Sequence, residues 1–269
     1  MTVLDNIKLR AKNISKSYGE EPENRVFVVD NISMEIAEKE LVVILGPTGC
    51  GKSTFMKILG GIQSASSGSI ELDGTDYGQE LPRDLHRKFG FVFQGDNLLQ
   101  WRTVEGNLKF NLETMHLKGE KWNKRVDEML EIVGLSQYRG IYPHELSGGM
   151  KQRTGIARAL VHDPEVLLMD QPFGALDAIT RRMLTFETLH IWRETQKTIV
   201  MVTNNVDEAI TLANRVFIFS PMPAHILHEV RIDIPDEQRD NNIGTLPKFL
   251  EYRKLLNEYV RSTMAGMEA

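Results

Sequence analysis

The stretch Gly46–Thr54, with the sequence Gly-Pro-Thr-Gly-Cys-Gly-Lys-Ser-Thr, constrains the fold more than any other part of the chain. Residues 41–45 before it are all apolar, and residues 55–59 after it have helical character. The glycines allow successive backbone N–H groups to point at one anion, and the N-terminus of the following helix adds positive potential. The alternative is a glycine-rich turn before a core helix. Since every fixed position of the motif is filled and both flanks fit, we interpret the stretch as a phosphate-binding loop between a strand and a helix.

The residues of this loop predict a nucleoside triphosphate with Mg²⁺ as the ligand. The Lys52 ammonium is expected to reach the β- and γ-phosphates, and the Ser53 hydroxyl is expected to bind Mg²⁺. The expected nucleotide-binding residues here are Gly46, Pro47, Thr48, Gly49, Cys50, Gly51, Lys52, Ser53 and Thr54.

Composition narrows the class of protein further. The 269 residues can form one large domain or two small ones, and the net charge of −5 does not favour a broad basic face for nucleic acid. With Cys50 as the single cysteine, no intrachain disulfide can form. The N-terminal residues lack the apolar core of a secretory signal, and no apolar run is long enough to cross a bilayer. We therefore expect a cytosolic protein that reaches a membrane only through a partner.

The hydrophobic pattern predicts an α/β fold. Residues 8–15 and 28–37 alternate apolar and polar side chains, which is typical of half-exposed antiparallel strands. Further along the chain, buried strands and helices follow one another, which favours a mostly parallel sheet with helices on both faces. These elements are expected at residues 166–170, 179–194, 198–203, 206–213 and 216–219.

The region between residues 97 and 164 has helical spacing instead, with helices expected at 104–115, 122–133 and 149–161. We interpret it as an inserted helical domain. Beyond Ser220 the chain is polar and rich in proline before a last amphipathic helix at 248–260, whose simplest role is packing against the core. The predicted division is a core with an antiparallel β subdomain (1–94 and 166–230), a helical domain (95–165) and a C-terminal extension (231–269).

Polar residues at strand and helix ends give further site candidates. Asp170 follows four apolar residues, the arrangement in which a carboxylate holds Mg²⁺ in phosphate-loop NTPases. Gln94 ends another buried run, where the chemistry of doubly wound sheets is found. Ser147, before Gly148 and Gly149, has two interpretations: an ordinary N-cap, or a second phosphate site made of a hydroxyl, backbone N–H groups and a helix N-terminus.

Taken together, these motifs resemble, in order and spacing, the nucleotide-binding subunit of an ABC transporter, over roughly residues 8–230. The fold implied is a phosphate-loop NTPase core with an inserted helical domain. By this resemblance Tyr18 stacks on the adenine, and Gln94 contacts Mg²⁺ and the attacking water and links them to the membrane subunit. Asp170 holds the metal.

The resemblance also implies contacts across a dimer. Residues 146–152 match the signature motif that contacts the γ-phosphate of the opposite subunit, and residues 175–177 match a loop that crosses the dimer interface. The nucleotide-binding residues implied are Ser147, Gly148, Gly149, Gln152 and Asp177.

Within this family, residues 97–104, 171–177 and 220–226 are similar to those of importers of nitrate, sulfonates and taurine. The partners implied are a second nucleotide-binding subunit, identical or homologous, two integral-membrane permease subunits and, for an importer, a solute-binding protein. No nucleic acid is expected. The location implied is the cytoplasmic face of the cell membrane, where the chain would be a peripheral subunit. Substrate choice belongs to the other subunits.

Two positions depart from the family pattern. Gln171 stands where the family has the glutamate that polarises the attacking water, and an amide cannot accept that proton. Asn204 stands where the family has a histidine that contacts the γ-phosphate, and an asparagine can donate a hydrogen bond but cannot become cationic. We therefore expect ATP binding with slow hydrolysis, with Lys52, Gln94, Gln171 and Asn204 as the residues around the reaction.

Three interpretations of the chain remain open, two that explain Gln171 and Asn204 and one that assigns a different function. Gln171 can be an introduced, isosteric replacement of the glutamate in an ATPase whose Asn204 is native, which we favour. The chain can instead be a naturally degenerate, regulatory subunit that binds ATP beside an active homologue. A soluble ABC-type ATPase acting on nucleic acid is the third reading, and the acidic pI of about 5.9 argues against it.

Overall fold

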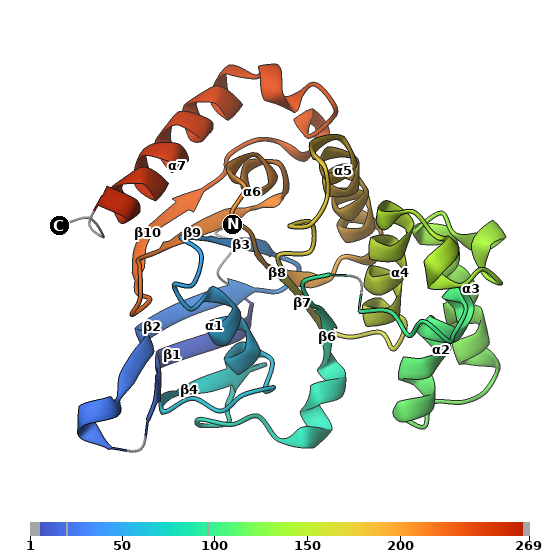
Figure 1. Ribbon diagram of the computed structural model, residues 1–269, viewed down its shortest axis with the longest axis horizontal. Coiled ribbons are helices and arrows are strands. Elements are labelled where there is room, and N and C mark those ends of the chain that lie inside the picture. Colours follow the sequence, from blue (N-terminus) through green and yellow to red (C-terminus); the bar gives the residue numbers. More distant parts are fainter. Residues whose placement is uncertain (1–5, 20, 96, 266–269) are drawn as a thin grey trace. The chain divides into compact units, whose positions relative to one another are not determined.

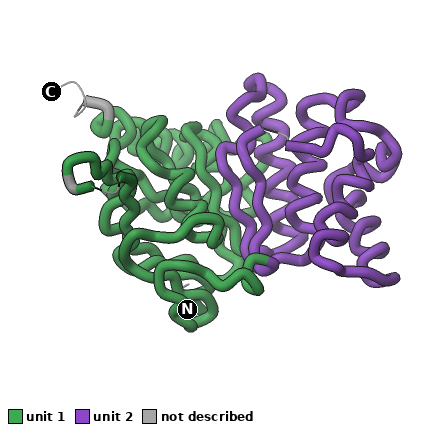
Figure 2. The backbone as a smooth tube through the Cα atoms, turned by 60° about the horizontal axis from the view of Figure 1, so that its bottom comes forward, with its two compact units in different colours: residues 1–86, 198–269 green, residues 87–197 purple. Residues whose placement is uncertain are grey.

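The computed structural model describes residues 6–19, 21–95 and 97–265. The chain divides into two compact units, one made of residues 1–86 and 198–269 and the other of residues 87–197 (Figure 2). Because the second unit is formed by one continuous segment, the first unit is built from both ends of the chain. The functional division into core, helical domain and extension stays a prediction.

The described residues form ten strands and seven α-helices, and Figure 1 labels all of them except β5. The strands are β1 (Ile7–Tyr18), β2 (Val26–Ala37), β3 (Leu41–Leu45), β4 (Ser67–Leu72), β5 (Thr75–Asp76), β6 (Phe89–Val92), β7 (Val166–Asp170), β8 (Thr198–Val202), β9 (Arg215–Phe219) and β10 (Ile226–Arg231). The helices are α1 (Lys52–Leu59), α2 (Val104–Thr114), α3 (Glu120–Ile132), α4 (Gly148–Leu160), α5 (Ala178–Thr195), α6 (Val206–Leu212) and α7 (Pro247–Ala265). No helix among these is long and apolar enough to cross a membrane.

The first unit contains two groups of paired strands. One is an antiparallel sheet with the order β2-β1-β4-β5. In the other, β3 lies parallel to β8 on one side and to β9 on the other, and β10 pairs antiparallel with β9. Figure 1 shows α1 on the side of these strands that faces the antiparallel sheet, and α6 and α7 on the other side. The predicted fold class, a phosphate-loop α/β fold with an antiparallel sheet, is confirmed.

Strand β3 is the centre of the first unit. All five of its residues, Leu-Val-Val-Ile-Leu, are fully buried, as expected for a parallel strand that is covered on both faces. Helix α1 is held beside it by an edge-to-face contact between Phe55 and Phe219 of β9, with 5.5 Å between the ring centroids. The strand that enters the phosphate loop and the helix that leaves it are therefore both fixed in the core.

A buried ion pair ties β2, β3 and β9 together. Arg215, the first residue of β9, donates from Nε to Glu40 Oε1 at 2.5 Å and from Nη2 to Glu40 Oε2 at 2.8 Å. Glu40 also accepts a hydrogen bond from the Ala37 backbone N–H at 2.9 Å and is almost completely buried. Burial lowers the pKa of Arg215, but hydrogen bonds to Glu40 and Glu229 outweigh it and raise that pKa above its ordinary value.

The C-terminal extension packs through α7 on the first unit. Phe249 and Leu256 are the buried apolar residues on this helix, and the Tyr259 ring stacks on His228 of β10 with 3.8 Å between the centroids. Sequence analysis did not predict β10 and described the chain beyond Ser220 only as polar and rich in proline. The strand exists because its backbone groups pair with β9, and its side chains are only half-buried at alternate positions, which leaves a weak hydrophobic pattern.

The second unit contains the parallel pair β6 and β7 and the helices α2 to α5. Side-chain caps begin three of these helices: Thr103 accepts from the Gly106 N–H at 3.2 Å, Ser147 from the Met150 N–H at 3.3 Å and Asp177 from the Ile179 and Thr180 N–H groups at 3.0 Å. The helices predicted in this region, three before β7 and one after it, are confirmed within two residues at each end.

The Glu40–Arg215 pair gives a first prediction. Arg215→Leu removes the cation and leaves the Glu40 carboxylate buried without it, so we expect the free energy of unfolding to fall by about 3–5 kcal/mol. Urea denaturation measures this change. Arg215→Leu combined with Glu40→Gln removes the stranded charge but keeps an acceptor for Ala37, and should recover at least half of the loss. Equal losses in the single and double variants would contradict this account.

Candidate nucleotide-binding site

The predicted phosphate loop connects the end of β3 at Leu45 to the start of α1 at Lys52. Gly49 has φ +79° and Gly51, the N-cap of α1, has φ +113°, conformations that L side chains rarely adopt. A Cβ atom on Gly51 would lie 2.6 Å from the Val28 carbonyl oxygen, whereas a Cβ on Gly49 would meet nothing within 4 Å. Gly51 is therefore required for close packing against β2, and Gly49 only for its backbone angle.

Lys52 lies within this loop with 3% of its surface exposed. Its Nζ donates to the carbonyl oxygens of Gly46 at 2.8 Å and Pro47 at 2.7 Å. These bonds hold the ammonium beside the loop backbone, where it could contact a phosphate bound to the loop. Burial raises the pKa of the neighbouring Cys50 thiol, although Lys52 opposes the shift, so the thiol remains protonated and serves packing.

Asn204 is brought to the loop by β8 and α6. Its Nδ2 donates to Thr48 Oγ1 at 3.4 Å, so an asparagine 156 positions away contacts the phosphate loop. In the preceding residue, Thr203, the backbone N–H donates to the Ile44 carbonyl of β3 at 3.2 Å. The following residue, Asn205, is the N-cap of α6 and accepts from the Glu208 N–H at 3.1 Å. Asn204 therefore lies beside the loop, and its contact with the γ-phosphate stays a prediction.

Tyr18 is the last residue of β1 and is 44% exposed. Its hydroxyl accepts a hydrogen bond from Gln63 Nε2, and the Lys16 ammonium lies 5.5 Å from the ring centroid. An aromatic ring whose hydroxyl is hydrogen-bonded and whose side chain is exposed to solvent is able to stack on a base. Its role in adenine binding stays a prediction.

The second unit carries the predicted metal ligand and the residue after it. Asp170 ends β7 and is 9% exposed, and Gln171 follows with φ +44°, which is uncommon for a residue other than glycine. The Gly174 N–H donates to the Gln171 carbonyl at 3.1 Å and closes a turn. The chain therefore turns directly after the end of β7. The Asp170 carboxylate and the Gln171 amide are consecutive in the sequence at this point.

Ser147 and Asp177, both predicted to contact nucleotide, act as helix caps in the structure. The backbone and side-chain hydrogen bonds from Thr180 lower the pKa of Asp177. The two caps also lie near each other, because a Cβ on Gly148 would be 3.1 Å from Leu176 Cδ2. In the cap the Ser147 hydroxyl accepts through its oxygen, and its O–H can still donate to an anion, so the ordinary role and the predicted role of Ser147 are compatible.

Gln152, another predicted nucleotide contact, is 4% exposed, and its Nε2 has no hydrogen-bond partner among the described residues. Gly149 faces Thr180, whose Cγ2 would be 3.5 Å from an added Cβ. The structure therefore places Gln152 in the interior of the second unit. A direct contact between Gln152 and nucleotide stays a prediction.

Gln94 is exposed and lies two residues after the end of β6, and its carbonyl accepts from Asn97 Nδ2 at 2.8 Å.

Sequence analysis missed Asn107, the residue that organises the segment 97–103 after Gln94. The fully buried Asn107 accepts from the Leu99 N–H and donates to the carbonyls of Leu99, Arg102 and Thr103 at 3.0–3.2 Å. Its only signal in the sequence is a polar residue on the apolar side of a helix.

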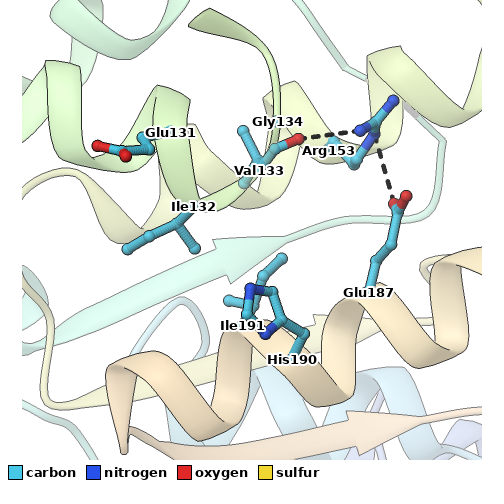
Figure 3. Close-up of a pocket in the computed structure, with 8 residues that line it drawn as sticks. All are labelled: Glu131, Ile132, Val133, Gly134, Arg153, Glu187, His190 and Ile191. Atoms are coloured by element: carbon cyan, nitrogen blue, oxygen red, sulfur yellow. Dashed lines mark hydrogen bonds and ion pairs between the residues drawn. The ribbon is translucent and has the colours of Figure 1, made fainter.

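A pocket of 210 Å³ lies in the second unit, and none of the predicted site residues lines it (Figure 3). Arg153 lines the pocket: its Nη1 donates to the Val133 carbonyl at 3.0 Å, and its Nε lies 3.4 Å from Glu187 Oε2. Burial raises the pKa of Glu187. The lining residues are Glu131, Ile132, Val133, Gly134, Arg153, Glu187, His190 and Ile191. Because these contacts join α3, α4 and α5, we interpret the pocket as a packing gap between helices.

Comparison with known proteins identifies the class. The model of the ABC transporter family matches residues 29–174, which include the phosphate loop, the Ser147 region and Asp170. Two solved structures of a dimeric ATP-binding cassette, one of them in a post-hydrolysis state with ADP and Pi, are similar, each with a TM-score of 0.70 at 30–31% identity. They match 84% of this chain and 100% of their own.

Three relatives match this chain over most of their own length. An uncharacterised ABC transporter ATP-binding protein of Methanocaldococcus jannaschii is 42% identical over 92% of this chain and 89% of its own. The taurine import ATP-binding protein of a Jannaschia species is 36% identical over 91% of each chain. The aliphatic sulfonates import ATP-binding protein of Bacillus subtilis is 40% identical over 87% of this chain and 88% of its own. The chain belongs to the ABC transporter family and contains its ATP-binding cassette, as predicted.

The two loop glycines give a matched pair of variants. Gly49→Ala introduces backbone strain alone and should cost about 1–3 kcal/mol of stability. Gly51→Ala adds a clash with the Val28 carbonyl and should cost more than Gly49→Ala, with a larger loss of nucleotide affinity. Denaturant titration and calorimetric ATP titration measure both quantities. A Gly51→Ala variant as stable as Gly49→Ala would show that β2 does not constrain the loop in this way.

Proposed function

We propose that this chain is the ATP-binding and ATP-hydrolysing subunit that energises an ABC importer of a small solute, of the nitrate, sulfonate or taurine type. The observation that carries the proposal is the loop in which Lys52 is buried against the Gly46 and Pro47 carbonyls while Asn204 reaches Thr48. The taurine and sulfonate import functions of the relatives support the class of solute.

The residues present suit ATP with Mg²⁺. Backbone N–H groups of the loop and the start of α1 favour phosphate oxygens, and the Lys52 ammonium can move from its carbonyl partners to the β- and γ-phosphates. Ser53 and Asp170 offer a hydroxyl and a carboxylate, the oxygen donors that Mg²⁺ prefers, with phosphate oxygens and water completing its shell. When bound, the ion would neutralise charge on the phosphates. Gln94 would contact the ion and the attacking water.

Transport would follow from closure of a dimer. Two copies, or this chain and a homologue, would meet head to tail around two ATP molecules, each held between one phosphate loop and the Ser147 region of the other subunit. Closure would drive two permease subunits between their access states, with a solute-binding protein delivering the solute. In this assembly the chain is a peripheral subunit at the cytoplasmic face of the membrane.

Gln171 and Asn204 set the expected rate. A general base contributes about 10²–10⁴-fold to such a reaction, and the Gln171 amide cannot accept a proton. Asn204 can donate to a γ-phosphate oxygen from its position beside Thr48, but without a positive charge. Closure with bound ATP is therefore expected, followed by slow reopening.

The same two residues favour a second candidate function, a regulatory subunit that keeps ATP as a structural ligand while an active homologue hydrolyses it. A role on nucleic acid is less well supported, because the net charge is −5.

Gln171→Glu separates the two main candidates. In the assembled transporter we expect this change to raise steady-state ATP hydrolysis by about 10²-fold or more, because it supplies the missing base. Lys52→Ala in the Gln171→Glu background is the control and should abolish the gain. An unchanged rate in Gln171→Glu, with ATP still bound, would favour the regulatory subunit.

Trp101 gives a test of the permease partner. It is 74% exposed on the segment that Asn107 holds in place, and an indole left in water on a fixed segment is typical of an interface anchor. Trp101→Ala should weaken co-purification with the permease subunits by about tenfold or more, equivalent to about 1.4 kcal/mol or more. ATP affinity of the isolated subunit should not change. Undiminished co-purification would place the permease contact elsewhere.

A further inference from the structure

The C-terminal extension holds both ends of α6, the helix that follows Asn204. At the N-terminal end, Arg253 of α7 forms a two-pronged ion pair with Asp207 of α6: Nε lies 2.7 Å from Oδ1 and Nη2 lies 2.6 Å from Oδ2. Parallel bonds of this kind fix the orientation of both groups as well as their distance. The Arg253 guanidinium also lies 5.0 Å from the centroid of the Phe249 ring, which is buried.

At the C-terminal end of α6, Arg239 is 4% exposed and donates to three backbone carbonyls. Its Nη1 reaches the Thr211 oxygen at 3.0 Å and its Nη2 reaches the Ala213 oxygen at 2.8 Å, while Nε binds the Ile234 oxygen at 3.2 Å. The last carbonyls of a helix have no partner within it, and a cation there also complements the helix dipole. This arginine therefore connects the extension to the end of α6.

The position of α6 is transmitted to Asn204 through three residues. Thr203 bonds to Ile44 of β3 and accepts the Asn205 N–H at 3.1 Å, and its hydroxyl donates to Glu208 Oε2 of α6 at 2.5 Å. Asn205 caps the same helix. Asn204 thus lies between a strand fixed in the core and a helix fixed by the extension, so a shift of α6 changes its distance from Thr48.

We propose that the C-terminal extension is a clamp that positions Asn204, with Arg253 and Arg239 as its positioning residues. The inference rests on the proposed function, because Asn204 is assigned there to the γ-phosphate of ATP. The clamp would set how strongly the site distinguishes ATP from ADP, since only ATP has the phosphate that Asn204 would contact. Whatever loosens α7 from α6 would weaken this distinction and leave the contacts of the phosphate loop with ADP intact.

The Arg253–Asp207 pair is suited to such tuning because it is partly exposed, with 39% and 51% of the two side chains accessible. Exposed pairs contribute little to global stability, so the pair can be removed without unfolding the chain. Lys248, in the same helix, provides a matched control. Its Nζ lies 2.7 Å from the carboxylate of Asp233 and donates to the Asp233 carbonyl at 3.0 Å, and both contacts lie within the extension.

The test is calorimetric titration of the full chain with Mg·ATP and with Mg·ADP, from which the ratio of the two affinities is obtained. Arg253→Gln should lower this ratio about two- to fivefold, mainly through weaker ATP binding, the effect expected for loss of one exposed ion pair. Arg253→Lys, which keeps the charge, should retain most of the ratio. Lys248→Gln should leave it unchanged.

A double variant distinguishes positioning from general stability. If Arg253 acts through Asn204, then Asn204→Ala should lower the ratio by itself, and Arg253→Gln should add nothing in the Asn204→Ala background. Independent, additive losses, or a fall in the ratio with Lys248→Gln equal to that with Arg253→Gln, would overturn the clamp while ATP binding stands. Failure of the unmodified chain to bind either nucleotide would overturn the proposed function and the clamp with it.

Discussion

A buried ammonium requires acceptors on all sides, and the loop around Lys52 provides them from its own backbone. The Gly46 and Pro47 carbonyls can converge on Nζ only because the loop turns sharply, and the turn needs positive φ at Gly49 and Gly51. A positive φ at each of these glycines is a conformation that other residues adopt only under strain. The loop persists because the strand before it and the helix after it are fixed in the core.

The remainder of the first unit can be understood as support for this loop. Strand β3 is paired on both sides and fully buried, and the Glu40–Arg215 ion pair anchors its start to β2 and β9. Phe55 and Phe219 hold α1 against the same strands. The antiparallel sheet contributes one close contact, in which the Val28 carbonyl lies where a side chain on Gly51 would be. The first unit is therefore organised around a backbone geometry that binds anions.

The two departures from the family pattern differ in physical character. Gln171 has the shape of a glutamate without its charge, so we propose that it leaves nucleotide binding intact and slows proton transfer. Asn204 is shorter than a histidine, yet it lies within hydrogen-bond distance of Thr48. Its position depends on the helix that follows, and this helix is held by a C-terminal extension whose role the sequence motifs do not describe. The extension and the phosphate loop are thereby parts of one mechanical arrangement.

The sequence by itself determined the loop, the class of fold and the family, because these depend on local features: residue types at fixed spacing, buried apolar runs and a cap residue such as Ser147. Tertiary structure alone decided the features that depend on distant partners. Strand β10 forms because β9 offers a free edge, and Asn204 contacts Thr48 across 156 positions because β8 pairs with β3. Arg253 meets Asp207 across 46 positions for the same reason. Local propensity encodes which elements form, whereas long-range packing determines which side chains meet.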